Sequence, residues 1–303
     1  MPEPDTDGPP PPDRNRPFQV DENLYPFTSH WLECDGGVLH YLDEGEGFPV
    51  LLLHGNPTWS FLYRDVIKAL RGHCRCIAPD YPGFGFSTAP AGYGYTPQGH
   101  TEWVAALIDH LELERYILVA HDWGGPIGLA AASQAPDRLA GMVLSNTWAW
   151  PVDLRVRLFS WIFGSPPARF LQRRLDLFAR YLLPLAVSRK ARKAPGIRAA
   201  YVAPFQERDR RLGPWMLTKS LRVSKDWLAE LEGGLHRLQH RPVALVWGMR
   251  DPAFGRRTYL GHWRRHFPHA RLHELGDAGH FLPEERPEEL ATQVLRALGR
   301  IEC

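Results

Sequence analysis

The stretch VAHDWGG, residues 119–125, joins a short apolar run to a glycine-rich segment. Its order is a small residue, any residue, a nucleophile, any residue and then glycine. This is the pattern of a nucleophile elbow, a tight strand–turn–helix that raises a reactive side chain above a parallel sheet. Serine usually stands at its centre, whereas this chain has Asp122 there. The pattern predicts a carboxylate nucleophile, and an aspartate that only caps a helix is the alternative.

Short apolar runs alternate with helix-like patterns on both sides of this stretch. The alternation predicts an α/β fold with a mostly parallel sheet flanked by helices. Helices are expected at Pro97–Leu111 and Gly125–Ala135. The expected strands are Val38–Asp43, Val50–His54, Cys74–Pro79, Tyr116–His121, Gly141–Asn146, Pro242–Gly248 and Arg271–Leu275.

The strand–helix alternation stops between residues 151 and 225, where prolines break several short helical patterns. We expect this segment, 151–225, to form a helical cap inserted after the strand that ends near Asn146. The α/β core would then comprise residues 18–150 and 226–303. A helical excursion that only covers the core is the alternative. Residues 1–17 are rich in proline and aspartate and are expected to form a disordered leader.

Composition narrows the classes of partner. The 303 residues carry 36 Lys and Arg against 34 Asp and Glu, a net charge of +2, which gives no reason to expect nucleic acid. No apolar run reaches the roughly 20 residues of a membrane span, and the N-terminal residues lack the apolar core of a secretory signal. Cys74 and Cys76 alternate along a predicted strand, so a buried reduced pair and a cytoplasmic location are expected.

The cap segment is strongly basic, with aromatic and aliphatic residues between the charges. We interpret this run as the solvated face of amphipathic helices. Self-association through it, as a homo-oligomer, and a weak membrane-surface contact are the alternatives. The basic residues are Arg155, Arg157, Arg169, Arg173, Arg174, Arg180, Arg189, Lys190, Arg192, Lys193 and Arg198.

Two further residues follow predicted strands in the order expected of a catalytic triad. His280 lies in GDAGHF, residues 276–281, after the last strand, and Asp251 lies in WGMRDP, residues 247–252. Asp122, Asp251 and His280 therefore follow the order nucleophile, acid, base of α/β hydrolases. A lone aspartate or histidine would be unremarkable, but three at the ends of parallel strands predict one site.

Two other positions could supply the acid. One follows the strand Gly141–Leu144, but Asn146 stands there and has no carboxylate. The other is Asp277, which is expected to shape the loop that carries His280. Asp251 is the better candidate.

The segment HGNP, residues 54–57, follows another predicted strand. In α/β hydrolases this loop supplies one backbone N–H of the oxyanion hole, and the residue after the nucleophile supplies the other. Asn56 and Trp123 hold these positions, and both also carry side-chain N–H donors. Donors beyond those of an oxyanion hole suggest a second anion.

Four motifs together resemble those of the haloalkane dehalogenases of the α/β-hydrolase superfamily. They are HGNPTWS at 54–60, DYPGFGFS at 80–87, HDWGG at 121–125 and GHF at 279–281. The resemblance implies Asp122 as nucleophile, His280 as base and Asp251 as acid. It also implies that Asn56 and Trp123 form the pair of residues that binds halide.

The Asn–Trp pair and the position of the acid are most similar to the third subfamily of these enzymes. The first subfamily uses a tryptophan of the cap as its second halide donor, for which Trp148, Trp150 and Trp161 are available. The second subfamily has a glutamate where this chain has Asn146, so the resemblance does not extend to it.

The resemblance implies hydrolysis of a carbon–halogen bond in a small apolar halogenated substrate. Asp122 would displace halide and form an alkyl ester, and water activated by His280 would cleave that ester to give alcohol, halide and a proton. No metal and no organic cofactor are implied. An epoxide hydrolase with the same nucleophile, base and acid is the alternative, with Tyr181 and Tyr201 as the residues that would protonate the epoxide oxygen.

Overall fold

The computed structural model describes residues 16–183 and 195–301. Its centre is an eight-stranded sheet of order β1-β2-β4-β3-β5-β6-β7-β8. The pairs β1–β2 and β2–β4 are antiparallel and the others are parallel. The strands are β1 (Ser29–Cys34), β2 (Gly37–Glu44), β3 (Pro49–Leu53), β4 (Arg75–Pro79), β5 (Tyr116–Asp122), β6 (Leu139–Thr147), β7 (Val243–Gly248) and β8 (Arg271–Leu275).

Helices surround the sheet, on both of its faces and above the ends of its strands. They are α1 (Arg64–Leu70), α2 (Pro97–His110), α3 (Gly124–Ala132), α4 (Leu154–Phe163), α5 (Pro166–Leu175), α8 (Pro195–Val202), α9 (Leu212–Val223), α10 (Lys225–Gly234), α11 (Arg257–His266), α12 (Leu282–Glu285) and α13 (Pro287–Leu298). The shorter turns are η1 (Ser60–Tyr63), η2 (Pro136–Arg138), η3 (Phe178–Leu182), η4 (Ala203–Phe205), η5 (Asp209–Arg211) and η6 (Leu235–Leu238). The α/β-hydrolase fold predicted from the sequence is thereby confirmed.

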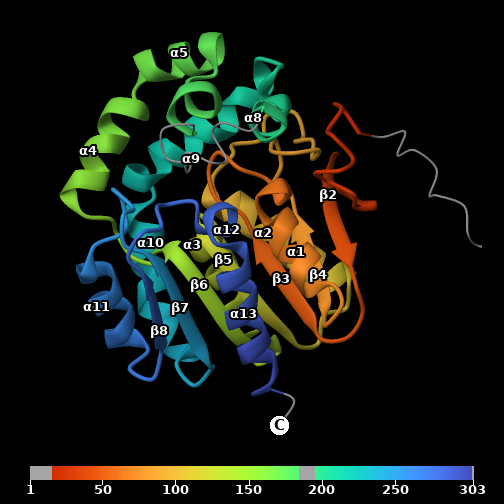
Figure 1. Cartoon of the computed structure of the whole chain (residues 1–303). Coiled ribbons are helices and arrows are strands. Elements are labelled where there is room, and N and C mark those ends of the chain that lie inside the picture. The colour runs from red at the N-terminus through yellow and green to blue at the C-terminus, as the bar shows by residue number, and fades with distance from the viewer. Residues whose placement is uncertain (1–15, 184–194, 302–303) are drawn as a thin grey trace, which may run out of the picture.

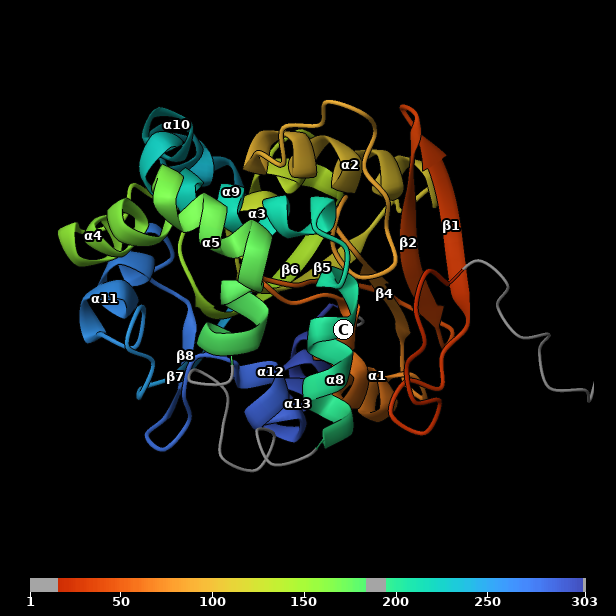
Figure 2. The same ribbon diagram turned by 90° about the horizontal axis from the view of Figure 1, so that it is seen from above.

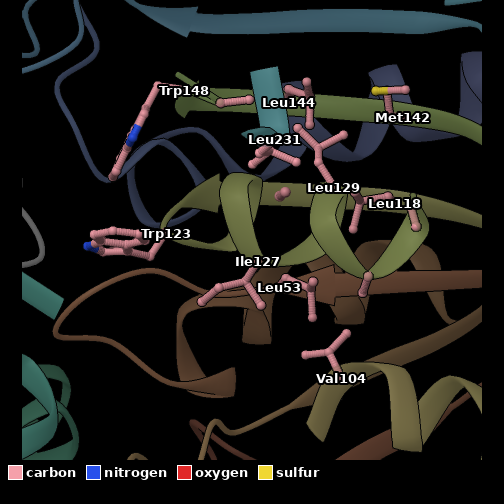
Figure 3. Packing of buried hydrophobic residues seen from close by; sticks show 14 of the residues in the cluster. Leu53, Val104, Leu118, Trp123, Ile127, Leu129, Met142, Leu144, Trp148 and Leu231 are labelled. Carbon is pink, nitrogen blue, oxygen red and sulfur yellow. The ribbon is translucent and has the colours of Figure 1, made fainter. Parts of the chain in front are cut away.

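The core is divided into two layers by the sheet. Figure 2 shows α2 and α3 on one face and α1 and α13 on the other. The first layer includes Val104 of α2, Ile127 of α3 and Leu118 of β5, which Figure 3 shows among the buried side chains of one cluster. The second includes Val66 of α1 and Val294 of α13. Strands buried on both faces explain the continuous apolar runs of the sequence.

Four of the helices between β6 and β7 lie apart from those that cover the two faces of the sheet. Figure 1 shows α4, α5, α8 and α9 together above one edge of the sheet. The bounds 151–225 and 18–150 with 226–303 stay predictions, because the structure does not divide the chain into units. Most of the expected leader, residues 1–15, and residues 184–194 of the expected cap lie outside the described residues. No helix of the described chain combines the length and apolarity needed to cross a bilayer.

All seven expected strands are present, and their bounds differ from the expected ones by at most two residues at either end. The edge strand β1 was missed because SHWLEC has no continuous apolar run. The turn that follows β1, however, has the sequence of a β-hairpin turn. Asp35 and Gly36 both adopt positive φ, as a two-residue Asp-Gly hairpin requires. The expected buried, reduced pair of Cys74 and Cys76 is confirmed, because both side chains are buried and their Sγ atoms lie 3.9 Å apart, too far for a disulfide bond.

The elbow between β5 and α3 depends on close contact with the neighbouring strands. A Cβ atom at Gly124 would overlap the carbonyl oxygen of Leu53, and one at Gly125 would overlap the hydroxyl of Thr147. Carbonyl groups of strands cannot move aside as a flexible side chain can. The two glycines therefore let α3 begin directly above β3 and β6.

Gly124→Ala is expected to lower the free energy of unfolding by about 1–3 kcal/mol, since overpacking against a fixed backbone forces the elbow to shift. Urea unfolding followed by circular dichroism measures the change. Gly261→Ala on α11 is the matched control, because a Cβ atom there meets nothing within 4 Å. An elbow variant as stable as this control would contradict the packing argument.

Candidate active site

Asp122 is the last residue of β5 and stands at the apex of the elbow. Its φ of +50° lies in the left-handed region, which is unfavourable for a residue with a side chain. The hydroxyl of Thr147 donates a 2.6 Å hydrogen bond to the carbonyl oxygen of Asp122 and so helps to hold the turn. The side chain of Asp122 is buried. Strain of this kind is characteristic of functional sites.

The loop after β3 approaches Asp122 closely. A Cβ atom at Gly55 would overlap Asp122, so only glycine permits the approach. The backbone N–H of Asn56 then donates a 2.8 Å hydrogen bond to Asp122 Oδ1. Burial raises the pKa of Asp122, whereas His280 and the backbone N–H groups of Asn56 and Trp123 act to lower it. The two predicted oxyanion-hole donors therefore both lie against this carboxylate.

His280 lies between the two predicted carboxylates. Its Nδ1 atom is 2.7 Å from Asp251 Oδ2, and its Nε2 atom is 3.7 Å from Asp122 Oδ2. The first distance is that of a strong hydrogen bond, whereas the second is too long for one and leaves the atoms adjacent. The three residues predicted from strand ends thus meet in space.

Asn146 holds Asp251 in place, a role that the sequence did not reveal. Its Nδ2 atom donates to Asp251 Oδ2 at 2.8 Å and to the carbonyl of Gly248 at 3.0 Å, while its Oδ1 atom accepts the N–H of Gly248 at 2.8 Å. The backbone N–H of Ala253 adds a 2.7 Å hydrogen bond to Asp251 Oδ1. The sequence identifies Asn146 only as a position that lacks a carboxylate, and no local pattern links it to a residue 105 positions away.

The pKa values of Asp251 and His280 are shifted in opposite directions. Burial acts to raise the pKa of Asp251, but the His280 cation and its hydrogen bond hold that pKa below its usual range. Burial likewise acts to lower the pKa of His280, and the charges of Asp251 and Asp122 together with the Asp251 hydrogen bond raise it to about 9. At neutral pH the resting site therefore holds an imidazolium between two carboxylates.

The side chains of Asn56 and Trp123 differ in their present partners. Asn56 Nδ2 lies 3.1 Å from both the carbonyl of Pro214 and Oγ1 of Thr218, so its amide donates toward α9. Trp123 Nε1 has no hydrogen-bond partner among the described residues. Figure 3 shows this nitrogen directed away from the packed core.

A cavity of about 430 Å³ opens over Asp122 and is lined mostly by apolar side chains. It is bounded by the catalytic candidates on the sheet side and by α4, η3 and α9 on the other. Its size and apolar character suit a small hydrophobic ligand. The lining residues are Asn56, Pro57, Asp122, Trp123, Arg155, Val156, Phe159, Phe178, Leu182, Leu183, Thr218, Leu221, Asp251, Pro252, Ala253, Phe254, His280 and Phe281.

Several side chains suggested by the sequence do not line this cavity. Tyr201 is buried and donates a 2.6 Å hydrogen bond to Glu284, and Tyr181 is exposed. Trp150 stacks on a histidine of α11, and Trp161 is exposed. Trp148 packs against Trp123 with ring centroids 5.0 Å apart.

One group of described residues has the chemistry of a metal site and lies elsewhere. Glu232 Oε1 is 2.5 Å from His262 Nε2 and 3.3 Å from His266 Nε2. Hydrogen bonds to the carboxylate satisfy both imidazoles as they stand. None of the three lines the cavity, and the expected absence of a metal and of an organic cofactor stays a prediction.

Comparison with known proteins identifies the family. The alpha/beta hydrolase fold family matches residues 49–287. Over 284 residues the chain is 41% identical to Haloalkane dehalogenase 2 of Mycobacterium tuberculosis (strain ATCC 25618 / H37Rv), with 93% of this chain and 99% of the relative covered. The chain belongs to the haloalkane dehalogenase family of α/β hydrolases.

One relative of this dehalogenase-family chain is named for a different activity. It is 34% identical to the Cis-3-alkyl-4-alkyloxetan-2-one decarboxylase of Shewanella oneidensis, with 90% of this chain and 89% of the relative covered. Its fold is similar to that of haloalkane dehalogenase DbeA from Bradyrhizobium elkani USDA94, with a TM-score of 0.83 and 25% identity. That alignment covers 91% of this chain and 99% of the solved one.

The charge distribution gives a titration test. The raised pKa means that His280 keeps its proton through neutral pH and loses it as the pH rises through about 9. Asp122→Asn removes one of the two negative charges, so His280 is expected to titrate at lower pH in this variant. NMR of the imidazole Cε1–H measures both pKa values, with His280→Gln identifying the signal. Equal pKa values in the two proteins would show that Asp122 does not act on His280.

Proposed function

We propose that this member of the family is a haloalkane dehalogenase that works through a covalent alkyl-enzyme ester. The observation that carries the proposal is the buried carboxylate of Asp122, which faces an apolar cavity. Behind it lies His280, 3.7 Å away, which is hydrogen-bonded to Asp251. The proposed partners are a small apolar halogenated substrate, water and the released halide.

In the first step, an oxygen of Asp122 attacks the sp³ carbon that bears the halogen. A carboxylate needs no general base to become a nucleophile. The C–O bond forms as the carbon–halogen bond breaks, and the halide leaves with the bonding electron pair. Trp123 Nε1–H would stabilise that charge, and the Asn56 amide would exchange a contact with α9 for one with the halide. By analogy with oxyanion-hole donors, each contributes about 2–4 kcal/mol.

In the second step, His280 takes a proton from water, and the oxygen attacks the carboxyl carbon of the ester. The ester carries no charge, so the electrostatic support that Asp122 gives to the imidazolium is lost. His280 thus loses a proton to solvent and becomes a base only after the first step has taken place. The backbone N–H groups of Asn56 and Trp123 stabilise the tetrahedral oxyanion. Collapse releases alcohol and restores the Asp122 carboxylate, and the net products are alcohol, halide and one proton.

The same chemistry explains why the elbow carries aspartate. A serine attacking the same carbon would form an ether, which water activated by histidine does not cleave. An aspartyl ester offers a carbonyl carbon to water, so the enzyme regenerates.

We assign the chain to the third subfamily as part of this proposal. The acid follows β7, and Asn146 occupies the position of the second subfamily's glutamate while supporting Asp251. Trp150 and Trp161 do not reach the cavity, and Trp148 packs on Trp123, which weighs against a first-subfamily halide site. Asn56 and Trp123 are left as the proposed halide pair.

Residues 151–225 are proposed to act as the cap that sets substrate range. Support comes from α4, η3 and α9, which line the cavity opposite the sheet. Phe159, Phe178 and Leu221 face the same space as Asp122 and would exclude water from the reacting carbon.

Decarboxylation of an alkyl-substituted oxetan-2-one is the second candidate. It is favoured by the 34% identity to a relative with that name, across 90% of this chain. The epoxide hydrolase alternative has less support. It would need two acids directed at the substrate oxygen, whereas Tyr181 is exposed and Tyr201 is committed to Glu284.

Asp122→Ala is expected to abolish bromide release from 1-bromobutane and 1,2-dibromoethane while circular dichroism shows an intact fold. The wild type is assayed in parallel for diol from styrene oxide and for carbon dioxide from a cis-3,4-dialkyl oxetan-2-one. Bromide release that survives the substitution would remove Asp122 from the nucleophile role. Carbon dioxide or diol formed without bromide release would move the assignment to the corresponding alternative.

His280→Phe is expected to permit the first step and block the second, since the base is absent and the nucleophile is intact. Intact-protein mass spectrometry after incubation with 1-bromobutane should show one added butyl group, and peptide mapping should locate it on Asp122. His262→Phe, on α11 and outside the cavity, is the matched control and should turn over without an adduct. An unmodified His280 variant would count against the two-step scheme.

A further inference from the structure

Exposed apolar side chains are concentrated on one part of the described surface. Eleven large hydrophobic residues are exposed in the described chain, and nine of them lie on α4, α5 and η3. Such a concentration marks an interaction site, since single exposed apolar residues are otherwise scattered. We call this surface the α4–α5 face, and its apolar members are Leu154, Leu158, Phe159, Trp161, Ile162, Phe170, Leu171, Leu175 and Tyr181.

Helix α4 has a buried side and an exposed apolar side. Its inner side carries Val156 and Ser160, which are buried and packed toward α9. On the opposite side, Leu154, Leu158 and Trp161 recur at the spacing of one helix face and are 74%, 58% and 58% exposed. A surface helix normally turns polar residues outward. Arg222 lies over the Trp161 ring, 4.2 Å from its centroid, but Leu154 and Leu158 stay mostly exposed, so the outward stripe has no apolar cover from the rest of the described chain.

Arginines border this stripe. Arg155 and Arg157 lie on α4, and Arg169, Arg173 and Arg174 lie on α5, all exposed. Arg173 pairs with Asp209 at 3.0 Å, whereas the other four form no ion pair within the described chain. The face is thus apolar at its centre and positive at its margins. Figure 1 and Figure 2 both show α4 and α5 next to each other at the outer boundary of the molecule.

We propose that the α4–α5 face binds the surface of a lipid bilayer that contains anionic lipids. Leu154, Leu158 and Phe170 would enter the boundary between headgroups and acyl chains, with α4 lying in the membrane plane. The arginines would contact lipid phosphates, and Trp161 and Tyr181 would lie at headgroup depth, where amphipathic rings are stable. A second copy of this chain fits less well, because an isologous contact would bring the same arginines together.

The face continues into the mouth of the cavity. Phe159 is 39% exposed and also lines the cavity, as do Arg155 of α4 and Leu182 of η3. A hydrophobic molecule dissolved in the bilayer would reach Asp122 along apolar side chains without crossing water. This entry route rests on the proposed function. It assigns to that function a substrate class, long-chain alkyl halides that partition into lipid.

Flotation of the full chain with lipid vesicles tests the proposal. Binding is expected to vesicles of phosphatidylcholine mixed with phosphatidylglycerol, at least about tenfold weaker to phosphatidylcholine alone, and reduced by high salt. Leu158→Ser with Phe170→Ser, and separately Arg157→Gln with Arg174→Gln, should each weaken binding about tenfold or more. Leu272→Ser and the pair Arg264→Gln with Arg296→Gln are the matched controls and should bind as the wild type does.

Each outcome bears on the proposal. Absent vesicle binding, or equal loss in the controls, would overturn it. So would a wild type that sediments as an oligomer and binds no vesicles, with Leu158→Ser/Phe170→Ser monomeric, because the face would then be a contact between copies.

Activity separates this proposal from the proposed function. Bromide release from dissolved 1-bromobutane should be the same in the α4–α5 variants and the wild type. Bromide release from vesicle-embedded 1-bromohexadecane should fall in the variants that bind vesicles less. Undiminished release in those variants would overturn the assigned substrate class. Vesicle binding without bromide release from either substrate would remove the dehalogenase proposal and leave the membrane surface in place.

Discussion

The buried carboxylate of Asp122 is the constraint on which the rest of the site depends. Removing a charge from water is costly unless hydrogen bonds and an opposite charge replace the hydration shell. The backbone N–H groups of Asn56 and Trp123 and the imidazolium of His280 do so here. These donors reach the carboxylate only because Gly55 and Gly124 let the backbone segments approach closely. The glycines of the two motifs are therefore as much a part of the site as the polar groups.

Electrostatic balance links the two steps of the proposed reaction. In the resting site, two carboxylates hold one proton on His280, which is the wrong state for a base. Ester formation neutralises Asp122 and lowers the attraction for that proton. Asp251 remains, fixed by Asn146 and the N–H of Ala253, and keeps the imidazole oriented. Under this mechanism the first step prepares the base for the second without a conformational change.

The sequence revealed what strand order and turn geometry determine. Parallel strands end at one edge of a sheet, so residues after β5, β7 and β8 converge there, and Asp122, Asp251 and His280 were found in this way. Contacts made by side chains across the fold were not visible. The bond from Asn146 to Asp251 and the bond from Tyr201 to Glu284 join residues 105 and 83 positions apart. Only the folded packing of neighbouring elements brings such atoms together.

Asn56 illustrates the same limit and has a consequence for the cap. The sequence predicts its amide as a donor near Asp122, but no sequence pattern indicates that Pro214 and Thr218 accept from it. One side chain thus connects the loop after β3 to α9. If halide draws this amide toward Trp123, as proposed, the contact with α9 is weakened at the same moment. A ligand can shift a conformation only by binding its two states unequally. Halide held by Asn56 meets that condition, so halide release would restore the contact that holds α9 over the cavity.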